Sequence, residues 1–190
     1  YTPQQVLDTA QELYERKLTT YPRSDCEYLP VNQRKDVPRI LQNIGALEAG
    51  KLAEWAAGAD GKIRSRAWND SKITAHHAII PTTVACSFDK LTSMQQHIYY
   101  LVAQAYLAQF YPIHEYDQTR MVIEAADETF IAHGKTVTVP GWKVLYQSDK
   151  HDEEDEEKGT LPPVRKRAGV HYQNRQVDKN ATQPPPRCTP

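Results

Sequence analysis

The sequence predicts an α+β fold, with a mainly α-helical first part and a smaller, antiparallel β-rich second part. Up to about residue 116, apolar residues recur at helical spacing behind N-capping signals. After Pro112 the chain changes to short β-branched stretches separated by turn signals, which is typical of an antiparallel sheet. We therefore expect an α-helical domain at 1–116, a β-rich segment at 117–182 and a linker at 183–190.

The string Thr2-Pro3-Gln4-Gln5 predicts the start of the first helix. Its threonine can cap the helix, its proline suits the first turn, and its last glutamine can complete a capping box. The helix should end near Lys17. Residues 18–22 should then be extended, because a residue that precedes a proline is pushed out of the α region. Tyr21 is thus expected on a rigid connection at the exit of the helix. The expected apolar face comprises Val6, Leu7, Ala10, Leu13 and Tyr14.

Two further helical stretches are expected before the β-rich part. The first covers 33–52, with Pro38 in an early turn, and a loop follows at 58–62. The second opens at Thr92-Ser93-Met94-Gln95, which again reads as a capping signal. The first stretch has an apolar stripe of Ile40, Leu41, Ile44 and Leu47. The buried face expected for the second consists of Ile98, Leu101, Val102, Ala105 and Ala108.

Four short strands are expected after the helices, with turns at 126–127, 133–134 and 140–141 between them. The strands are 120–125, 129–132, 137–139 and 143–146. An acidic loop at 149–158 then interrupts the sheet, which resumes weakly around 169–177.

Charge and cysteine content limit the class of protein. A formal net charge of −1 argues against a uniformly basic nucleic-acid-binding protein, so any positively charged surface that binds nucleic acid must be confined to part of the chain. The acidic run at 149–157 and the basic cluster at 165–167 read most simply as a solvated loop of mixed charge. The three cysteines form no CxxC pair, which fits a reducing cytoplasm and no structural metal site. No apolar run is long enough to span a bilayer.

The segment at 18–30 holds the most informative residues. Tyr21 and Arg23 stand two residues apart in an extended stretch, so both side chains can reach the same site. A tyrosine hydroxyl is a weak nucleophile near neutral pH because a phenol has a pKa of about 10, and it needs a nearby cation or base. The Arg23 guanidinium can supply that charge and suits a phosphodiester, whose negative charge grows in the transition state. Taken alone, a Tyr-x-Arg triplet is common, and Tyr21 packed under a helix is the simpler alternative.

The longer string Leu18-Thr19-Thr20-Tyr21-Pro22-Arg23-Ser24-Asp25-Cys26 resembles the nucleophile motif of type IA DNA topoisomerases, in its topoisomerase III form. The resemblance implies that Tyr21 forms a 5′-phosphotyrosine bond with one DNA strand and that Arg23 assists at the scissile phosphate. It also implies strand passage and religation without ATP. Glu27 departs from the family pattern, in which a basic or neutral residue is common, so no DNA contact is assigned there.

A second string, Lys72-Ile73-Thr74-Ala75-His76-His77-Ala78-Ile79-Ile80-Pro81-Thr82, is similar to the other signature of the same family. By this resemblance His76 is the third catalytic residue, because it matches a family histidine that contacts DNA near the active site. His77 matches a position that varies in the family. The DNA-binding residues that the resemblance implies are Thr20, Arg23, Ser24, Lys72, His76 and His77.

The resemblance covers the whole chain, strongly at 1–116 and more loosely in the region at 117–182, which resembles part of the family's β-rich gate domain. The start at Tyr1 and the closing proline run lead us to expect a piece of a longer polypeptide. Type IA enzymes hold Mg²⁺ on an acidic cluster in a separate domain, and no Asp-x-Asp-x-Glu string occurs in this sequence. We therefore expect Mg²⁺ to bind outside this chain, which by itself should be inactive.

One alternative is a different tyrosine-nucleophile enzyme, which the order and the spacing of the residues both disfavour. A tyrosine recombinase places its tyrosine after the arginine and histidine that serve it, whereas Tyr21 precedes His76. A relaxase carries two histidines around an apolar residue, whereas His76 and His77 are adjacent. The remaining alternative is a non-catalytic module that binds single-stranded DNA by stacking and phosphate contacts. The partners expected are single-stranded DNA and the other domains of the same polypeptide, and no membrane.

Overall fold

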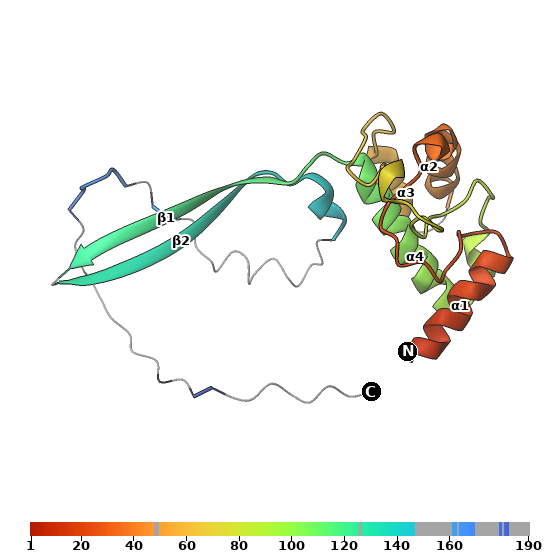
Figure 1. Ribbon diagram of the computed structural model, residues 1–190, viewed down its shortest axis with the longest axis horizontal. Coiled ribbons are helices and arrows are strands. Elements are labelled where there is room, and N and C mark those ends of the chain that lie inside the picture. Colours follow the sequence, from red (N-terminus) through yellow and green to blue (C-terminus); the bar gives the residue numbers. More distant parts are fainter. Residues whose placement is uncertain are drawn as a thin grey trace.

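The computed structural model describes residues 1–47, 50–125 and 127–146, with short pieces at 161–162, 164–169, 179 and 181–182. Within these ranges, four α-helices form a helical unit and a two-stranded antiparallel hairpin extends away from it (Figure 1). The predicted α+β fold is confirmed. The predicted acidic loop at 149–158, nearly all of the weak strand at 169–177 and the linker at 183–190 lie outside the described residues.

Helix α1 (Pro3–Glu15) begins as its capping signal predicts. The Thr2 side chain accepts a hydrogen bond from the Gln5 amide, and the Gln5 side chain accepts one from the Thr2 amide, which completes the capping box. Leu13 is fully buried and anchors the helix in the core. Lys17 adopts a left-handed φ of 60°, so the helix cannot continue, and the predicted end near this residue is confirmed.

The predicted helical stretch at 33–52 is divided into three elements. A 3₁₀ helix (Val31–Asp36) leads into α2 (Val37–Gly45), and α3 (Lys51–Gly58) packs against α2. A single helix was therefore the wrong prediction. The chain turns between α2 and α3, where Gly50 takes a φ of 50° that side-chain-bearing residues rarely adopt. The apolar stripe of this region is confirmed, since Ile40, Ile44 and Leu47 are buried.

Helix α4 (Ser93–Leu107) also starts with its predicted capping box, formed by Thr92 and Gln95. Its predicted buried face is right only in part, since Ala108 is buried and Ile98 and Val102 are half-buried. Leu101 is 62% exposed and Ala105 is exposed, whereas the buried residues of this helix are Gln95, Tyr99, Ala103, Tyr106 and Leu107. The two tyrosines decide the orientation, because their large rings pack edge-on against phenylalanines at 88 and 110 and bury more area than an aliphatic side chain.

The hairpin consists of β1 (Glu115–Ala125) and β2 (Glu128–Val139). The predicted strands at 120–125, 129–132 and 137–139 all lie within it. The predicted turn at 133–134 is wrong, because His133 pairs with Arg120 and Gly134 pairs with Thr119 in one continuous ladder. A glycine inside a strand only weakens it locally, and the uninterrupted cross-strand pairing from Tyr116 to Ala125 outweighs that cost here.

The chain returns to the helical unit immediately after β2. The predicted strand at 143–146 is instead part of a 3₁₀ helix (Gly141–Leu145). The Trp142 amide donates to the Pro112 carbonyl at 3.0 Å, and Leu145, only 1% exposed, joins the helical core. The Gln104 side-chain amide donates to the Leu145 carbonyl. The segment that follows the hairpin is thus fastened beside the segment that precedes it.

Candidate functional site

Two segments far apart in the sequence lie side by side after helix α1. The Thr20 amide donates to the Ile80 carbonyl at 2.9 Å, and the Thr82 amide donates to the Leu18 carbonyl at 3.1 Å. An isolated antiparallel bridge joins the two segments between these bonds. The extended backbone expected at 18–22 is thus held by a partner segment at 80–82, which brings both sequence motifs to one place.

Side chains of the first motif reinforce this pairing. The Thr20 hydroxyl accepts from the Ile80 amide at 3.0 Å and donates to the Ala78 carbonyl at 3.2 Å. The Ser24 hydroxyl donates to the His77 carbonyl at 2.8 Å. Both hydroxyls were predicted from the family resemblance to bind DNA, and in this structure they hold the segment at 76–80 in place. The predicted contacts with DNA stay predictions.

The Tyr21 and His76 rings lie next to each other. Their centroids are 4.7 Å apart and their planes are inclined by 34°. The Tyr14 ring of α1 meets Tyr21 edge-on, at 5.6 Å and 80°. Tyr21 is half-buried between these two rings, while His76 is exposed. The Tyr21 side chain is therefore restrained by one ring from α1 and one ring from the second motif, and it adjoins a histidine, a side chain that can accept or donate a proton.

The two cations predicted at the site are placed differently. Arg23 is exposed, and its guanidinium forms no hydrogen bond or ion pair with any residue that the structure describes. Lys72 is exposed at the end of a 3₁₀ helix (Asp70–Lys72), and its carbonyl lies 3.9 Å from the Cys26 sulfur. The structure thus brings Tyr21 and His76 into contact and leaves both cations open to solvent.

His77 is engaged on both ring nitrogens. Its Nδ1 lies 2.8 Å from the Ala78 carbonyl and its Nε2 lies 3.0 Å from the Gln33 side-chain amide nitrogen. Nδ1 therefore carries the proton and donates, while Nε2 accepts from Gln33. Gln33 lies in the 3₁₀ helix that precedes α2, and sequence reasoning did not find it, because a glutamine without a motif carries no signal. Its contact restrains the residue next to His76.

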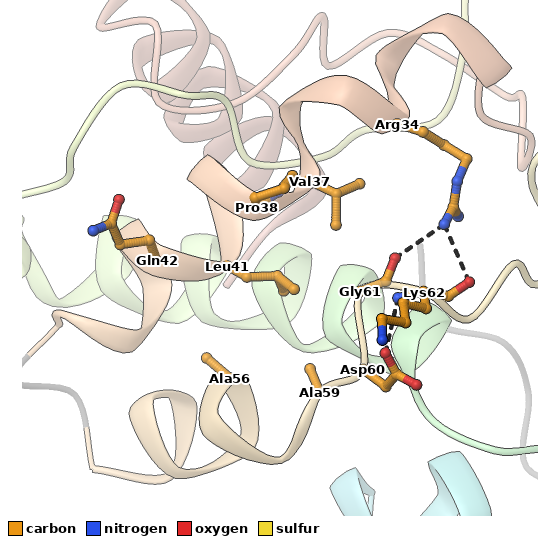
Figure 2. Close-up of a pocket in the computed structure, with 10 residues that line it drawn as sticks. All are labelled: Arg34, Val37, Pro38, Leu41, Gln42, Ala56, Ala59, Asp60, Gly61 and Lys62. Atoms are coloured by element: carbon orange, nitrogen blue, oxygen red, sulfur yellow. Dashed lines mark hydrogen bonds between the residues drawn. The ribbon is translucent and has the colours of Figure 1, made fainter.

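A separate hollow of about 540 Å³ lies between α2 and α3, and Figure 2 shows the side chains around it. Its floor is apolar, with Val37, Leu41 and Ala56. The Arg34 guanidinium points to the loop that carries Gly61 and Lys62, and it donates to the carbonyls of Gly61, Lys62 and Ile63 at 2.9–3.3 Å. This arginine is already used by the backbone, and none of the predicted site residues line the hollow.

The described ranges contain no group of three His, Cys, Asp or Glu side chains placed to hold a metal ion. Among the helices that the structure describes, none combines the length and apolar character needed to cross a bilayer.

Comparison with known proteins agrees with the two motifs. DNA topoisomerase 3 of Vibrio cholerae is 40% identical over 186 residues, which cover 97% of this chain and 28% of that protein. The corresponding protein of Haemophilus influenzae is 39% identical over 184 residues, covering 96% of this chain and 28% of that protein. That of Bacillus licheniformis is 33% identical over 192 residues, covering 98% and 26%.

The chain thus spans less than a third of the length of these relatives. The model of the protein family described as "DNA topoisomerase" matches residues 1–190. Since the family match extends over the whole chain and the relatives named DNA topoisomerase 3 are 33–40% identical over nearly all of it, the chain belongs to the DNA topoisomerase family, in its type IA, topoisomerase III-like branch.

Proposed function

We propose that this chain supplies the nucleophile with which a topoisomerase III-like enzyme opens one strand of DNA. The Tyr21 oxygen attacks a backbone phosphorus, and the bond from phosphorus to the 3′ oxygen breaks. The phenol loses its proton, the 3′ oxygen gains one, and the 5′ end stays attached to Tyr21. After another strand has passed, the 3′ hydroxyl attacks the phosphotyrosine and restores the backbone. No ATP is consumed, because the phosphotyrosine bond retains the energy of the broken one.

The packing of the His76 ring against the Tyr21 ring, at 4.7 Å, is the observation that carries this proposal. It places one residue of each motif beside the other, at the tyrosine that is the proposed nucleophile. His76 restrains the tyrosine and, being exposed, can also donate a hydrogen bond to a phosphate oxygen. Arg23 and Lys72 are exposed cations on the same two segments, and we assign them to the phosphates of the bound strand.

Three other residues hold the site in shape. Thr20 and Ser24 bind backbone carbonyls of the second segment, and His77 is held by Gln33. Such support matters because a displacement of about 1 Å at reacting groups can cost about 100-fold in rate. We therefore assign Thr20, Ser24 and His77 mainly to positioning His76 beside Tyr21.

The proposed reaction needs groups beyond those described in this chain. The described residues do not fit a magnesium site, because they offer no cluster of three ligands, and no step is assigned to a metal held by them. We propose that Mg²⁺ and the acid for the leaving oxygen come from the remaining polypeptide. When bound there, Mg²⁺ would supply positive charge near the DNA phosphates. Groups that act together in catalysis lose several orders of magnitude in rate when some are missing.

The covalent step is tested with a labelled single-stranded oligonucleotide and Mg²⁺. The 190-residue chain alone should form no adduct that survives denaturant, whereas the polypeptide that also contains the remaining domains should form one. Tyr21→Phe in the longer polypeptide should abolish the adduct, and His76→Ala should slow its formation. An adduct that persists in Tyr21→Phe would show that another residue is the nucleophile.

A second candidate function, binding of single-stranded DNA without chemistry, is favoured by the exposure of Arg23 and Lys72. It applies to the chain taken by itself. Binding should be weak and should fall with salt, because each phosphate contact releases counterions. Arg23→Ala should weaken binding and Tyr21→Phe should not. Equal affinities of the parent chain and Arg23→Ala in a low-salt titration would contradict the assigned phosphate contact.

A further inference from the structure

The hairpin has two chemically different faces. In an antiparallel pair, residues directly opposite each other share a face, and neighbours along a strand alternate between faces. Gln118 lies opposite Lys135, and Arg120 lies opposite His133. Tyr116, two positions before Gln118, and Val137, directly opposite Tyr116, lie on the same side of the half of the hairpin nearest the helical unit. We name the polar and aromatic residues of this side, Tyr116, Gln118, Arg120, His133 and Lys135, the hairpin face.

Charge is segregated between the two sides of this half of the hairpin. The hairpin face carries the cations Arg120 and Lys135 and no carboxylate. Asp117, by the alternation of the strand, belongs to the opposite side. The Arg120 and Lys135 side chains are exposed and make no ion pair with residues that the structure describes. A chain with a net charge of −1 thus presents a local cationic surface away from the tyrosine motif.

An aromatic ring lies at the base of this surface. The Lys135 ammonium lies 4.6 Å from the centroid of the Tyr116 ring, which is 48% exposed. The His114 ring lies 5.6 Å from the same ring and is held by a 3.0 Å contact between its Nδ1 and the Pro140 carbonyl. A hollow of about 290 Å³ opens here, lined by Gln118, His133 and the backbone of Gly134 together with the tyrosine and the lysine.

We propose that the hairpin face is a second binding surface for single-stranded DNA, separate from the Tyr21 site. Arg120 and Lys135 contact consecutive phosphates, and a base stacks on Tyr116. The lysine stem is flexible, so its ammonium can leave the ring for a phosphate when a base takes its place. Cations combined with an exposed aromatic ring are the arrangement by which proteins hold single strands without reading their sequence.

Charge complementarity favours DNA over a protein as the occupant. The centre of a protein interface is depleted of charged residues, whereas the centre of the hairpin face is formed by Arg120, Lys135 and the polar Gln118. The proposal rests on the proposed function only for the choice of DNA as the partner. It requires no covalent chemistry, so equilibrium binding tests it even if Tyr21 proves not to be the nucleophile.

The test is a fluorescence anisotropy titration of the 190-residue chain with labelled oligo-dT, at several salt concentrations. All variants carry Arg23→Ala and Lys72→Ala, which remove the two phosphate contacts assigned to the Tyr21 site. Adding Arg120→Ala and Lys135→Ala should weaken binding and should make the slope of log K against log salt shallower by about 1.4, at about 0.7 per lost phosphate contact. Tyr116→Ala should weaken binding at least about fivefold, whereas Tyr116→Phe should bind like the parent.

The matched control is Arg39→Ala with Lys51→Ala, which removes the same charge from exposed positions on α2 and α3. Circular dichroism verifies that each variant is folded. A loss of affinity for oligo-dT in the hairpin variants and not in the control pair supports the proposal. An equal loss of affinity in the control pair, or unchanged binding in the hairpin variants, overturns it. Unchanged DNA binding with altered self-association would assign the face to a protein contact instead, and would also overturn it.

Discussion

Replacing Thr20 by Val should destabilise the chain by about 1–3 kcal/mol, because it leaves a buried donor without a partner. Valine keeps the size and β-branching of threonine but lacks the hydroxyl. The Ile80 amide, which donates to that hydroxyl at 3.0 Å, belongs to a residue that is only 5% exposed. The Ala78 carbonyl loses less, since the His77 ring still donates to it. The cost therefore comes mainly from one unsatisfied N–H group.

Urea denaturation followed by far-UV circular dichroism measures this change directly. For a chain of this length, each kcal/mol should also lower Tm by about 2–4 °C. Thr20→Ser retains the hydroxyl and is the matched control, with a loss expected well below that of Thr20→Val. A Thr20→Val chain within about 0.5 kcal/mol of the parent, the range of an ordinary surface substitution, would refute the inference that Thr20 holds the second segment.

The same two variants show whether the Thr20 hydroxyl holds the second segment in place or contacts DNA. In the longer polypeptide, Thr20→Val should slow formation of the covalent adduct more than it weakens DNA binding, because it loosens the segment that presents His76 to Tyr21. If Thr20→Val were fully stable and lost affinity for DNA, the hydroxyl would be a ligand of the DNA and not a support of the site.

Two further predictions concern the core and the hairpin base. Gly141→Ala should lower the free energy of unfolding by more than about 1–2 kcal/mol, because Gly141 has a φ of 56° and a Cβ there would lie 2.5 Å from the Pro112 carbonyl oxygen. Urea denaturation measures this loss. The control Gly45→Ala, whose Cβ would lie 3.7 Å from its nearest neighbour, should change the free energy of unfolding little. Burial raises the pKa of Tyr99 and of Tyr106 above the ordinary tyrosine value of 10.0, so both phenols are held neutral in the folded state. The stability that these neutral phenols contribute is complete below pH 10 and is lost as the pH rises further, so the two tyrosines should ionise only as the chain unfolds. A pH titration of phenolate absorbance measures this. Ionisation of all tyrosines near pH 10 with the fold intact would contradict the prediction.

Helix starts were predictable because they depend on neighbouring residues. The capping boxes at Thr2 and Thr92 need only a threonine, a glutamine three positions later and a helix that follows. Both formed as predicted. The buried face of α4 was not predictable in the same way, because helical spacing alone favours the more apolar Ile98 over Tyr99, whereas the shape of the surrounding core places the larger Tyr99 ring inside.

The sequence motifs singled out Tyr21 and His76, whose roles stay predictions, but they gave no sign of the contacts that hold these residues together. Family motifs supplied Tyr21 and His76, and the packing of their rings follows from a pairing between segments that no local pattern encodes. Gln33 escaped notice because its contact with His77 depends on the path of the chain through the helical unit. The continuous strand β2 was missed for a related reason, since partner residues on β1 carry the ladder through Gly134.

The hairpin leaves and rejoins the helical unit at one place, where the Trp142 amide binds the Pro112 carbonyl. With 11 and 12 residues in its strands, the hairpin is about 36 Å long at about 3.3 Å per residue. An arm with a single pivot can swing as a rigid body without stretching either strand. A rotation of about 5° at the base would carry the tip through about 3 Å over that length. A small change in the packing of Leu145, whose carbonyl accepts from Gln104 of α4, would thus produce a larger displacement at the far end of the hairpin.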